Sequence, residues 1–229
     1  RGRRRFVIDD QRLLPIDDAV RERLLAWLER FAKTHERPKF YRPLDVARRA
    51  AGTGSLGLRR YVALVRGKGS PNGNYLLDLK QACASSVATT WPKLQPAWAS
   101  QAERVVTVQR RAQAIAPAFL MAVQFDNASY VLKELQPTQD RLDLARVQGR
   151  DRPLAHVLAT MGRLAAWAAL RGSGRQGAAN ADALIDFAHR TAWRRRLLDA
   201  AQSYAAIVIA DWRAYRQAWR DGACRLEQR

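Results

Sequence analysis

Three glycines in one short segment are the residues whose types and spacing could do chemistry. They stand in the run Gly52-Thr53-Gly54-Ser55-Leu56-Gly57, and Lys80 follows 23 residues after Gly57. The simplest interpretation of the run is a tight turn, because glycine tolerates positive φ. The simplest interpretation of Lys80 is a strand-edge lysine whose ammonium reaches water. A lysine in an apolar strand is costly to bury unless an anion meets it, so the two features together favour a phosphate contact.

Three phosphate-binding motifs contain such glycines, and the flanking residues distinguish between them. A dinucleotide fingerprint requires a helix directly after the loop, whereas residues 60–65 are rich in β-branched and aromatic types and predict a strand. A Walker A loop requires Gly-Lys-Ser/Thr, which Gly67-Lys68-Gly69 does not supply. A protein-kinase loop requires a hairpin over the phosphates and a lysine on the third strand. This last order is present, with Lys80 as the lysine.

The partner of that lysine is the next question. In a kinase lobe, a glutamate on an inserted helix holds it. Glu103 is the acidic residue between Ser100 and Pro117. The segment Ser100-Gln101-Ala102-Glu103 is also a capping box, in which Glu103 would bond the backbone at Ser100. Both roles remain open, and Gln109 and Gln113 are polar alternatives on the same helix.

The elements that must position these residues predict an α+β fold. We expect a five-stranded antiparallel sheet of the kinase N-lobe kind, one helix packed on it, and a helical subdomain after it. The short extended segment 6–8 precedes a first helix from Asp17, which Asp17 or Asp18 caps, to about Lys33. The predicted strands are 44–51, 60–65, 74–81, 119–125 and 130–135. Turns are expected at 67–73 and at Asp126-Asn127.

The predicted helices surround and follow this sheet. One runs from Ser100 to the residue before Pro117, and three more occupy the last third of the chain. The last three cover 153–171, with Gly172 at C′, a helix that Asn180 caps, and 193–221. The chain then divides into three segments. These are an N-terminal segment 1–43, a sheet with the glycine-rich loop 44–137, and a helical subdomain 138–229.

Composition excludes several classes of protein. The 229 residues are 48% hydrophobic and 27% charged, which is ordinary for a globular chain. No stretch of 18 uncharged apolar residues occurs, so we expect no membrane span and a cytoplasmic location. Two cysteines, far apart, exclude a disulfide framework and a cysteine zinc site. The first residue is Arg1 rather than Met, and we expect the chain to be a piece of a longer protein.

The net charge of +19 is the most prominent compositional feature. Such a charge favours polyanionic partners, nucleic acid above all. The arginines, however, are spread along the chain, for example at Arg59-Arg60, Arg110-Arg111 and Arg194-Arg195-Arg196. Phosphate contacts without base contacts give affinity without sequence selectivity. We therefore expect any nucleic-acid binding to be weak and non-specific.

Several segments together resemble the C-terminal half of the bacterial domain of unknown function 2252 family. The similarity extends from about Arg3 to Trp219. The segments that carry it are Leu44-Asp45-Val46-Ala47-Arg48 before the glycine run, Leu77-Asp78-Leu79-Lys80-Gln81-Ala82, Glu103-Arg104-Val105-Val106-Thr107-Val108-Gln109-Arg110, and Tyr130-Val131-Leu132-Lys133-Glu134-Leu135. Its most specific part is Arg104-Val105-Val106 with Gln109-Arg110.

The resemblance implies a kinase of the aminoglycoside-phosphotransferase kind with its parts permuted. The family's other half carries a Gly-Asp-x-His-x-x-Asn-Phe-Gly segment and an Asp-Phe-Asp, which resemble catalytic and metal-binding loops. Neither motif occurs in these 229 residues. The family's Ala-His-Ala-Arg-Ser-Gly-Asp is replaced here by Ala168-Ala169-Leu170-Arg171-Gly172-Ser173-Gly174, as in a divergent member. We expect the isolated chain to be inactive in phosphoryl transfer.

The predicted function is therefore nucleotide binding within a kinase-like phosphotransferase, with ATP and magnesium as cofactors. Gly52, Gly54 and Gly57 would cover the phosphates, and the amides of Thr53 to Leu56 would bond them. Lys80 would contact the α- and β-phosphates, with Glu103 as its partner on the helix. Glu134, Leu135 and Gln136 would offer backbone groups to the base. The substrate would be an unknown small molecule or protein.

Two other hypotheses remain open from the sequence. The chain could be a catalytically inactive kinase-like interaction module, or a basic nucleic-acid-binding protein. Binding of ATP with magnesium distinguishes the first hypothesis from both.

Overall fold

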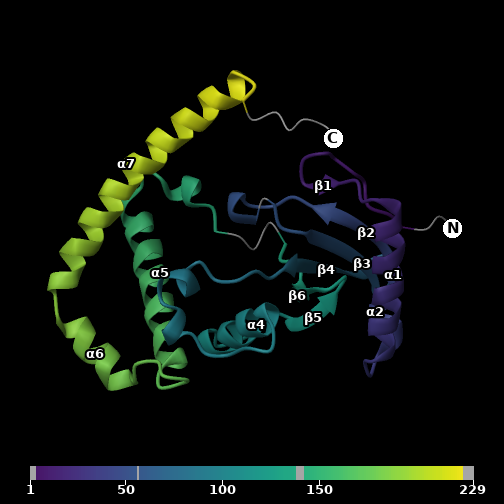
Figure 1. Ribbon diagram of the computed structural model, residues 1–229, viewed down its shortest axis with the longest axis horizontal. Coiled ribbons are helices and arrows are strands. Elements are labelled where there is room, and N and C mark those ends of the chain that lie inside the picture. The colour runs from purple at the N-terminus through teal and green to yellow at the C-terminus, as the bar shows by residue number, and fades with distance from the viewer. Residues whose placement is uncertain (1–3, 56, 138–141, 224–229) are drawn as a thin grey trace. The chain divides into compact units, whose positions relative to one another are not determined.

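The structure, a computed structural model, describes residues 4–55, 57–137 and 142–223 (Figure 1). The chain divides by its internal contacts into two compact units, Arg1–Ala178 and Ala179–Arg229. The first contains the sheet and the helices packed on it. The segment 138–229, predicted as one helical subdomain, is divided between the two units, because its first helix belongs to the first unit.

The first unit is built on a six-stranded antiparallel sheet with the strand order β1-β2-β3-β4-β6-β5. A meander of β2, β3 and β4 forms its centre, and the hairpin of β5 and β6 adds to β4 through β6. The strands are β1 (Leu13–Leu14), β2 (Pro43–Arg49), β3 (Arg60–Gly69), β4 (Gly73–Gln81), β5 (Met121–Phe125) and β6 (Ala128–Glu134). The strand predicted at 60–65, directly after the glycine loop, is confirmed.

One face of the sheet is covered by α1 (Asp18–Lys33). Its cap is Asp17, whose side chain accepts a hydrogen bond from the Val20 amide at 3.1 Å, which confirms one of the two predicted caps. Leu24 and Leu28, four residues apart on one helix face, are fully buried against the sheet. The strand side chains of this main core are Val46, Tyr61, Ala63, Val65, Leu77, Leu79, Phe125, Tyr130 and Leu132.

The other face is covered at one side by α4 (Gln101–Ala112). Ala102 and Val106 of α4 form a second core cluster with Leu120 and Val131. Successive residues of a strand point to opposite faces, and Val131 lies between Tyr130 and Leu132 of the main core. α4 and α1 therefore pack on opposite faces of the sheet. The rest of the first unit comprises the short helices α2 (Pro38–Tyr41) and α3 (Val87–Thr90), and α5 (Asp151–Gly172), which packs along α4.

The second unit consists of α6 (Ala181–His189) and α7 (Ala192–Arg220). Asn180 caps α6 as predicted, with its side chain accepting from the Ala183 amide at 2.8 Å. The rings of Phe187 and Trp193 stack with centroids 5.3 Å apart and so join the two helices. The large apolar side chains exposed along α7 include Leu197, Tyr204, Val208, Trp212, Tyr215 and Trp219. Among the described helices, none is both long and apolar enough to cross a membrane.

The number of strands predicted from the sequence was wrong, because the sheet has six rather than five. The extra strand is β1, and the segment 6–8, predicted as extended, is not part of the sheet. The Asp9 carboxylate accepts hydrogen bonds from the amides of Gln11, Arg12 and Leu13 at 2.7–3.0 Å. This turn redirects the chain, so Leu13 and Leu14 pair with the end of β2.

Several strand boundaries also differ from the prediction, and the backbone explains two of the differences. The strand predicted over 119–125 begins at Met121, because Phe119 has a left-handed backbone with φ 60°. The turn predicted over 67–73 is shorter, because β3 continues to Gly69, which pairs with Gly73. At Gly67, φ is 57°, and an added Cβ would lie 2.1 Å from the Gly73 carbonyl oxygen. Glycine is therefore required at 67 both for its φ and for the close approach of β4.

We expect Gly67→Ala to lower the free energy of unfolding by at least about 1–2 kcal/mol, the usual cost of a left-handed backbone for a residue with a Cβ. The clash with Gly73 adds to that cost. Gly54→Ala is the control, since an added Cβ there meets nothing within 4 Å. Denaturant unfolding of both variants measures the difference, and equal midpoints would contradict the role assigned to Gly67.

Tyr130 in the core makes the free energy of unfolding depend on pH in the alkaline range. Burial raises the pKa of Tyr130 from its ordinary value of 10 to about 12. The unfolded chain therefore loses this proton first, so the stabilisation is complete below pH 10 and disappears as the pH rises toward 12. We expect a loss of at most about 2–3 kcal/mol over that window. Urea unfolding of the parent and of Tyr130→Phe measures it, and parallel curves for the two proteins would show that Tyr130 is not the cause.

Candidate functional site

The glycine loop, Gly52 to Gly57, joins β2 to β3, and its first residues, Gly52 to Ser55, form a compact turn. Gly52 and Gly57 have left-handed backbones, with φ of 74° and 83°, whereas Gly54 does not. Residues Thr53–Ser55 form a 3-10 turn, in which the Ser55 amide donates to the Gly52 carbonyl at 3.1 Å. Of the amides predicted to bond phosphate, that of Ser55 is thus engaged within the loop. Leu56, another of them, lies outside the described residues.

Lys80 lies on β4 at the end of the sheet that carries the glycine loop. The register of the sheet places it between Arg60, the first residue of β3, and Val131 of β6. Directly opposed residues share a face, and Val131 packs under α4. Lys80 therefore projects on the α4 side, is partly buried, and makes no hydrogen bond or ion pair with any residue that the structure describes.

Asp78 lies two residues before Lys80, so its side chain is on the same face. It is only 1% exposed. Arg60 donates two hydrogen bonds to the Asp78 carboxylate, from Nε at 2.8 Å and from Nη2 at 2.7 Å. Arg49 of β2 donates a further bond at 3.2 Å. The burial of this carboxylate is thereby compensated by two guanidinium groups.

We call Arg49, Arg60, Asp78 and Lys80 the charged cluster. Arg60 also donates from Nη1 to the carbonyl of Ala51 at 3.2 Å, so the cluster is tied to the residue before Gly52. Sequence reasoning singled out Lys80 and missed the other members. The signal that could have found them is Asp78, a carboxylate between Leu77 and Leu79 in a strand buried on both faces.

Glu103 lies on α4, where its amide donates to the Ser100 side chain at 3.1 Å. This is one half of the predicted capping box. Of the described ion pairs, none joins Glu103 to Lys80. The predicted polar alternatives, Gln109 and Gln113, bond to each other at 3.2 Å. Gln113 is the C-cap of α4, because the helix ends at Ala112 rather than before Pro117 as predicted.

The residues predicted to meet a base, Glu134 to Gln136, lie at and just after the end of β6, away from Lys80. Glu134 stands opposite Leu77, three residues along β4 from Lys80, which is about 10 Å at the usual strand rise. The Glu134 amide donates to the Ala118 carbonyl and that of Leu135 to the Leu76 carbonyl, both at 2.8 Å. The amides of these two residues are therefore engaged within the protein and are not free to bond a base.

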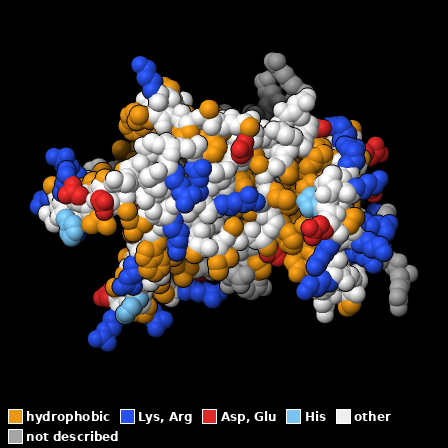
Figure 2. Space-filling view, turned by 90° about the horizontal axis from the view of Figure 1, so that it is seen from below, with side chains coloured by type: hydrophobic (Ala, Val, Ile, Leu, Met, Phe, Trp, Pro, Cys, Tyr) orange, Lys and Arg blue, Asp and Glu red, His pale blue; other side chains and the backbone are white. Residues whose placement is uncertain are grey.

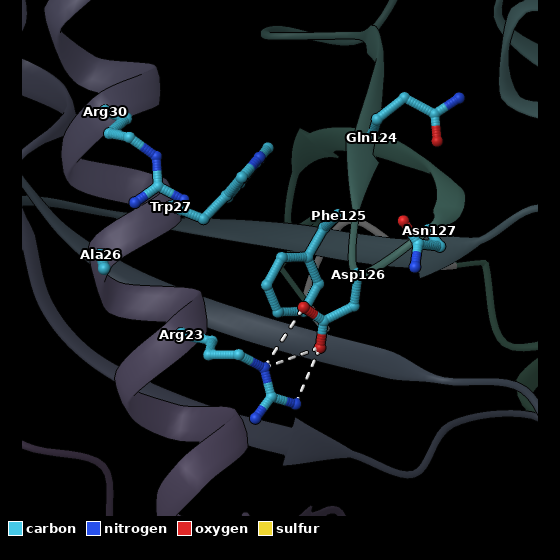
Figure 3. Close-up of a pocket in the computed structure, with 8 residues that line it drawn as sticks. All are labelled: Arg23, Ala26, Trp27, Arg30, Gln124, Phe125, Asp126 and Asn127. Carbon is cyan, nitrogen blue, oxygen red and sulfur yellow. Dashed lines mark hydrogen bonds and ion pairs between the residues drawn. The ribbon is translucent and has the colours of Figure 1, made fainter.

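Several pockets lie elsewhere on the first unit. The pocket in Figure 3, of about 570 Å³, lies between α1 and the β5–β6 turn, where Arg23 holds Asp126 with hydrogen bonds of 2.9–3.3 Å. A second, of about 350 Å³, is lined by Gly57, Tyr61 and the start of α1. A third, of about 580 Å³, is lined by aromatic side chains of α2, β4 and Phe119. None of these three includes Lys80.

The positive charge is not gathered in one block on the face shown in Figure 2. Lys and Arg side chains are scattered there among hydrophobic ones. This distribution agrees with the spread of arginines along the sequence. The local charge of the cluster, rather than the overall charge of +19, is what distinguishes the end of the sheet beside the glycine loop.

Comparison with known proteins gave a family match. A model of the family described as "Uncharacterized protein conserved in bacteria (DUF2252)" matches residues 1–218. Neither curated proteins nor solved structures gave a match.

The charged cluster predicts that Asp78→Ala lowers the free energy of unfolding far more than Asp126→Ala. We expect Asp78→Ala to lower the free energy of unfolding by about 3–5 kcal/mol, because it leaves buried guanidinium groups without their carboxylate. Asp126→Ala removes the more exposed pair with Arg23 and should cost about 0.2–1 kcal/mol. Thermal or denaturant unfolding of both variants checks this expectation. A small, equal loss in both would show that the Asp78 pairs contribute no more than an exposed pair.

Proposed function

The chain belongs to the bacterial DUF2252 family of uncharacterised proteins, and we propose that it is the nucleotide-binding portion of a kinase-like phosphotransferase. The glycine loop covers the phosphates of the nucleotide, and Lys80 contacts them. The base lies toward Glu134 and Leu135. The observation that carries the proposal is Lys80, which is partly buried beside Arg60 and has no hydrogen-bond or ion-pair partner among the described residues.

The order of elements supports this proposal. The glycine loop lies within the β2–β3 hairpin, the lysine is on the third strand of the meander, and α4 is inserted before the last two strands. A kinase nucleotide lobe requires this order, because the loop and the lysine must meet the same phosphates. A dinucleotide-binding unit requires a helix where β3 stands.

The chemistry of Lys80 supports it further. Lys80 is partly buried and has no carboxylate partner in the part of the chain that the structure describes, and such an ammonium favours an anionic ligand. Phosphate oxygens supply that charge. The cost of leaving Lys80 unpaired is then offset when the nucleotide binds.

The described residues contain no group of three His, Cys, Asp or Glu side chains that could hold a metal ion. Magnesium would therefore arrive with the nucleotide, bound to its phosphates, as this ion is commonly held in phosphoryl-transfer sites. It would neutralise phosphate charge there. The acidic motifs that the family resemblance implies for catalysis are absent from this sequence, so binding, and not transfer, is the activity proposed for this chain.

We expect Lys80→Met to weaken the binding of ATP with magnesium by about one to two orders of magnitude, since a charge-assisted bond contributes roughly 1.5–3 kcal/mol. Lys68→Met is the matched control, because it removes the same charge from the opposite end of β3, where Lys68 is exposed. Calorimetric titration of both variants and the parent decides the comparison. Equal affinities, or a parent that binds no nucleotide, would leave an inactive interaction module as the better hypothesis.

A further inference from the structure

We propose that Arg60 is a second phosphate-binding residue, held in position by Asp78, and that the site takes ligands with two or more linked phosphates in preference to a monophosphate. This inference rests on the proposed nucleotide site and assigns to it a residue and a ligand class that Lys80 alone does not determine.

The first step is the position of Arg60 next to Lys80. The two residues are directly opposed on neighbouring antiparallel strands, so their Cβ atoms lie about 4.5–5.5 Å apart on one face of the sheet. Like charges placed opposite each other in this way are destabilising. Asp78 offsets part of this repulsion through its bonds to Arg60. An anion between or above the two cations would reduce it further, and linked phosphates present adjacent anionic groups.

The second step is the way Asp78 holds Arg60. Nε and Nη2 of Arg60 donate to the two carboxylate oxygens of Asp78 at 2.8 and 2.7 Å. The third nitrogen, Nη1, donates to the Ala51 carbonyl at 3.2 Å. The Arg60 side chain is 15% exposed. A guanidinium carries five N–H donors, and these three contacts fix its plane while leaving donors on both terminal nitrogens. Asp78 is therefore a positioning residue for a cation that is ordered before the ligand binds.

The third step is the location of the pair relative to the glycine loop. Ala51 precedes Gly52, and Arg60 begins the strand that leaves the loop. A ligand bound under the glycine loop would therefore contact Arg60 at the start of β3 and Lys80 on the neighbouring strand β4. A monophosphate can satisfy one of these cations fully, whereas a di- or triphosphate can bridge both.

The test uses a variant that leaves the net charge unchanged. Arg60→Gln with Asp78→Asn removes one positive and one negative charge together, and the new amides keep hydrogen-bonding groups in the buried positions. We expect this double variant to bind ATP and ADP about ten- to a hundredfold more weakly, the effect of one lost charge-assisted bond. The affinity for AMP should change by less than about threefold, because its one phosphate is held by Lys80.

Two further variants distinguish the positioning of Arg60 by Asp78 from an effect of net charge alone. Asp78→Asn raises the net charge by one, and a site governed by bulk charge would then bind ATP more tightly. We expect weaker binding instead, because Arg60 loses its charged anchor. Arg59→Gln is the control, since it removes one positive charge from the exposed neighbour of Arg60 and should change ATP affinity by less than about threefold. Calorimetry is run below the thermal unfolding transition of each variant, which circular dichroism establishes.

The outcomes distinguish this inference from the proposed function. Loss of ATP and ADP affinity in the double variant, with AMP affinity retained, supports it. If Lys80→Met weakens ATP binding while the double variant matches the parent, Arg60 is not a phosphate contact and the nucleotide site stands without it. If Asp78→Asn binds ATP more tightly, the positioning role of Asp78 is wrong. If the parent binds none of the three nucleotides, both the site and this inference fall.

Discussion

A carboxylate buried in the central strand is the constraint on which the arrangement of the sheet depends. Asp78 is in β4, whose neighbouring residues Leu77 and Leu79 are fully buried on the opposite face. A charge in that position is stable only when it is paired and hydrogen-bonded. The partners come from β2 and β3, so the ion pairs join the three strands of the meander from one face. The hydrophobic contacts of α1 join them from the other.

This arrangement also explains why the site lies where it does. The α1 face is filled by apolar side chains, and α4 covers the other face at β5 and β6. The charged cluster lies on that second face, on β2, β3 and β4, beside the loop that joins β2 to β3. The same carboxylate that stabilises the meander thus holds Arg49 and Arg60 on the face that carries Lys80, and Arg60 lies directly opposite Lys80. A single set of contacts serves both packing and the proposed anion site.

The sequence determined the elements that short-range rules control. The caps Asp17, Ser100 and Asn180 each accept the predicted backbone hydrogen bond, because capping depends on residues two or three positions apart. The strand after the glycine loop followed from its β-branched and aromatic residues, and the β5–β6 turn followed from Asp126-Asn127, both of which have left-handed backbones. Family membership also followed from segments that lie within single elements.

Only the tertiary structure decided how distant residues combine. The strand order, which places β6 between β4 and β5, sets Lys80 beside Arg60 and Val131, and no local pattern specifies such a register. β1 was missed because its two residues form a strand only when the Asp9 turn brings them to β2. Asp78 was missed for the same reason, since its partner Arg49 lies 29 residues away in the sequence. Periodicity and capping depend on residues that are close together in the sequence. Strand register and ion pairing depend on contacts that form only when the sheet has assembled.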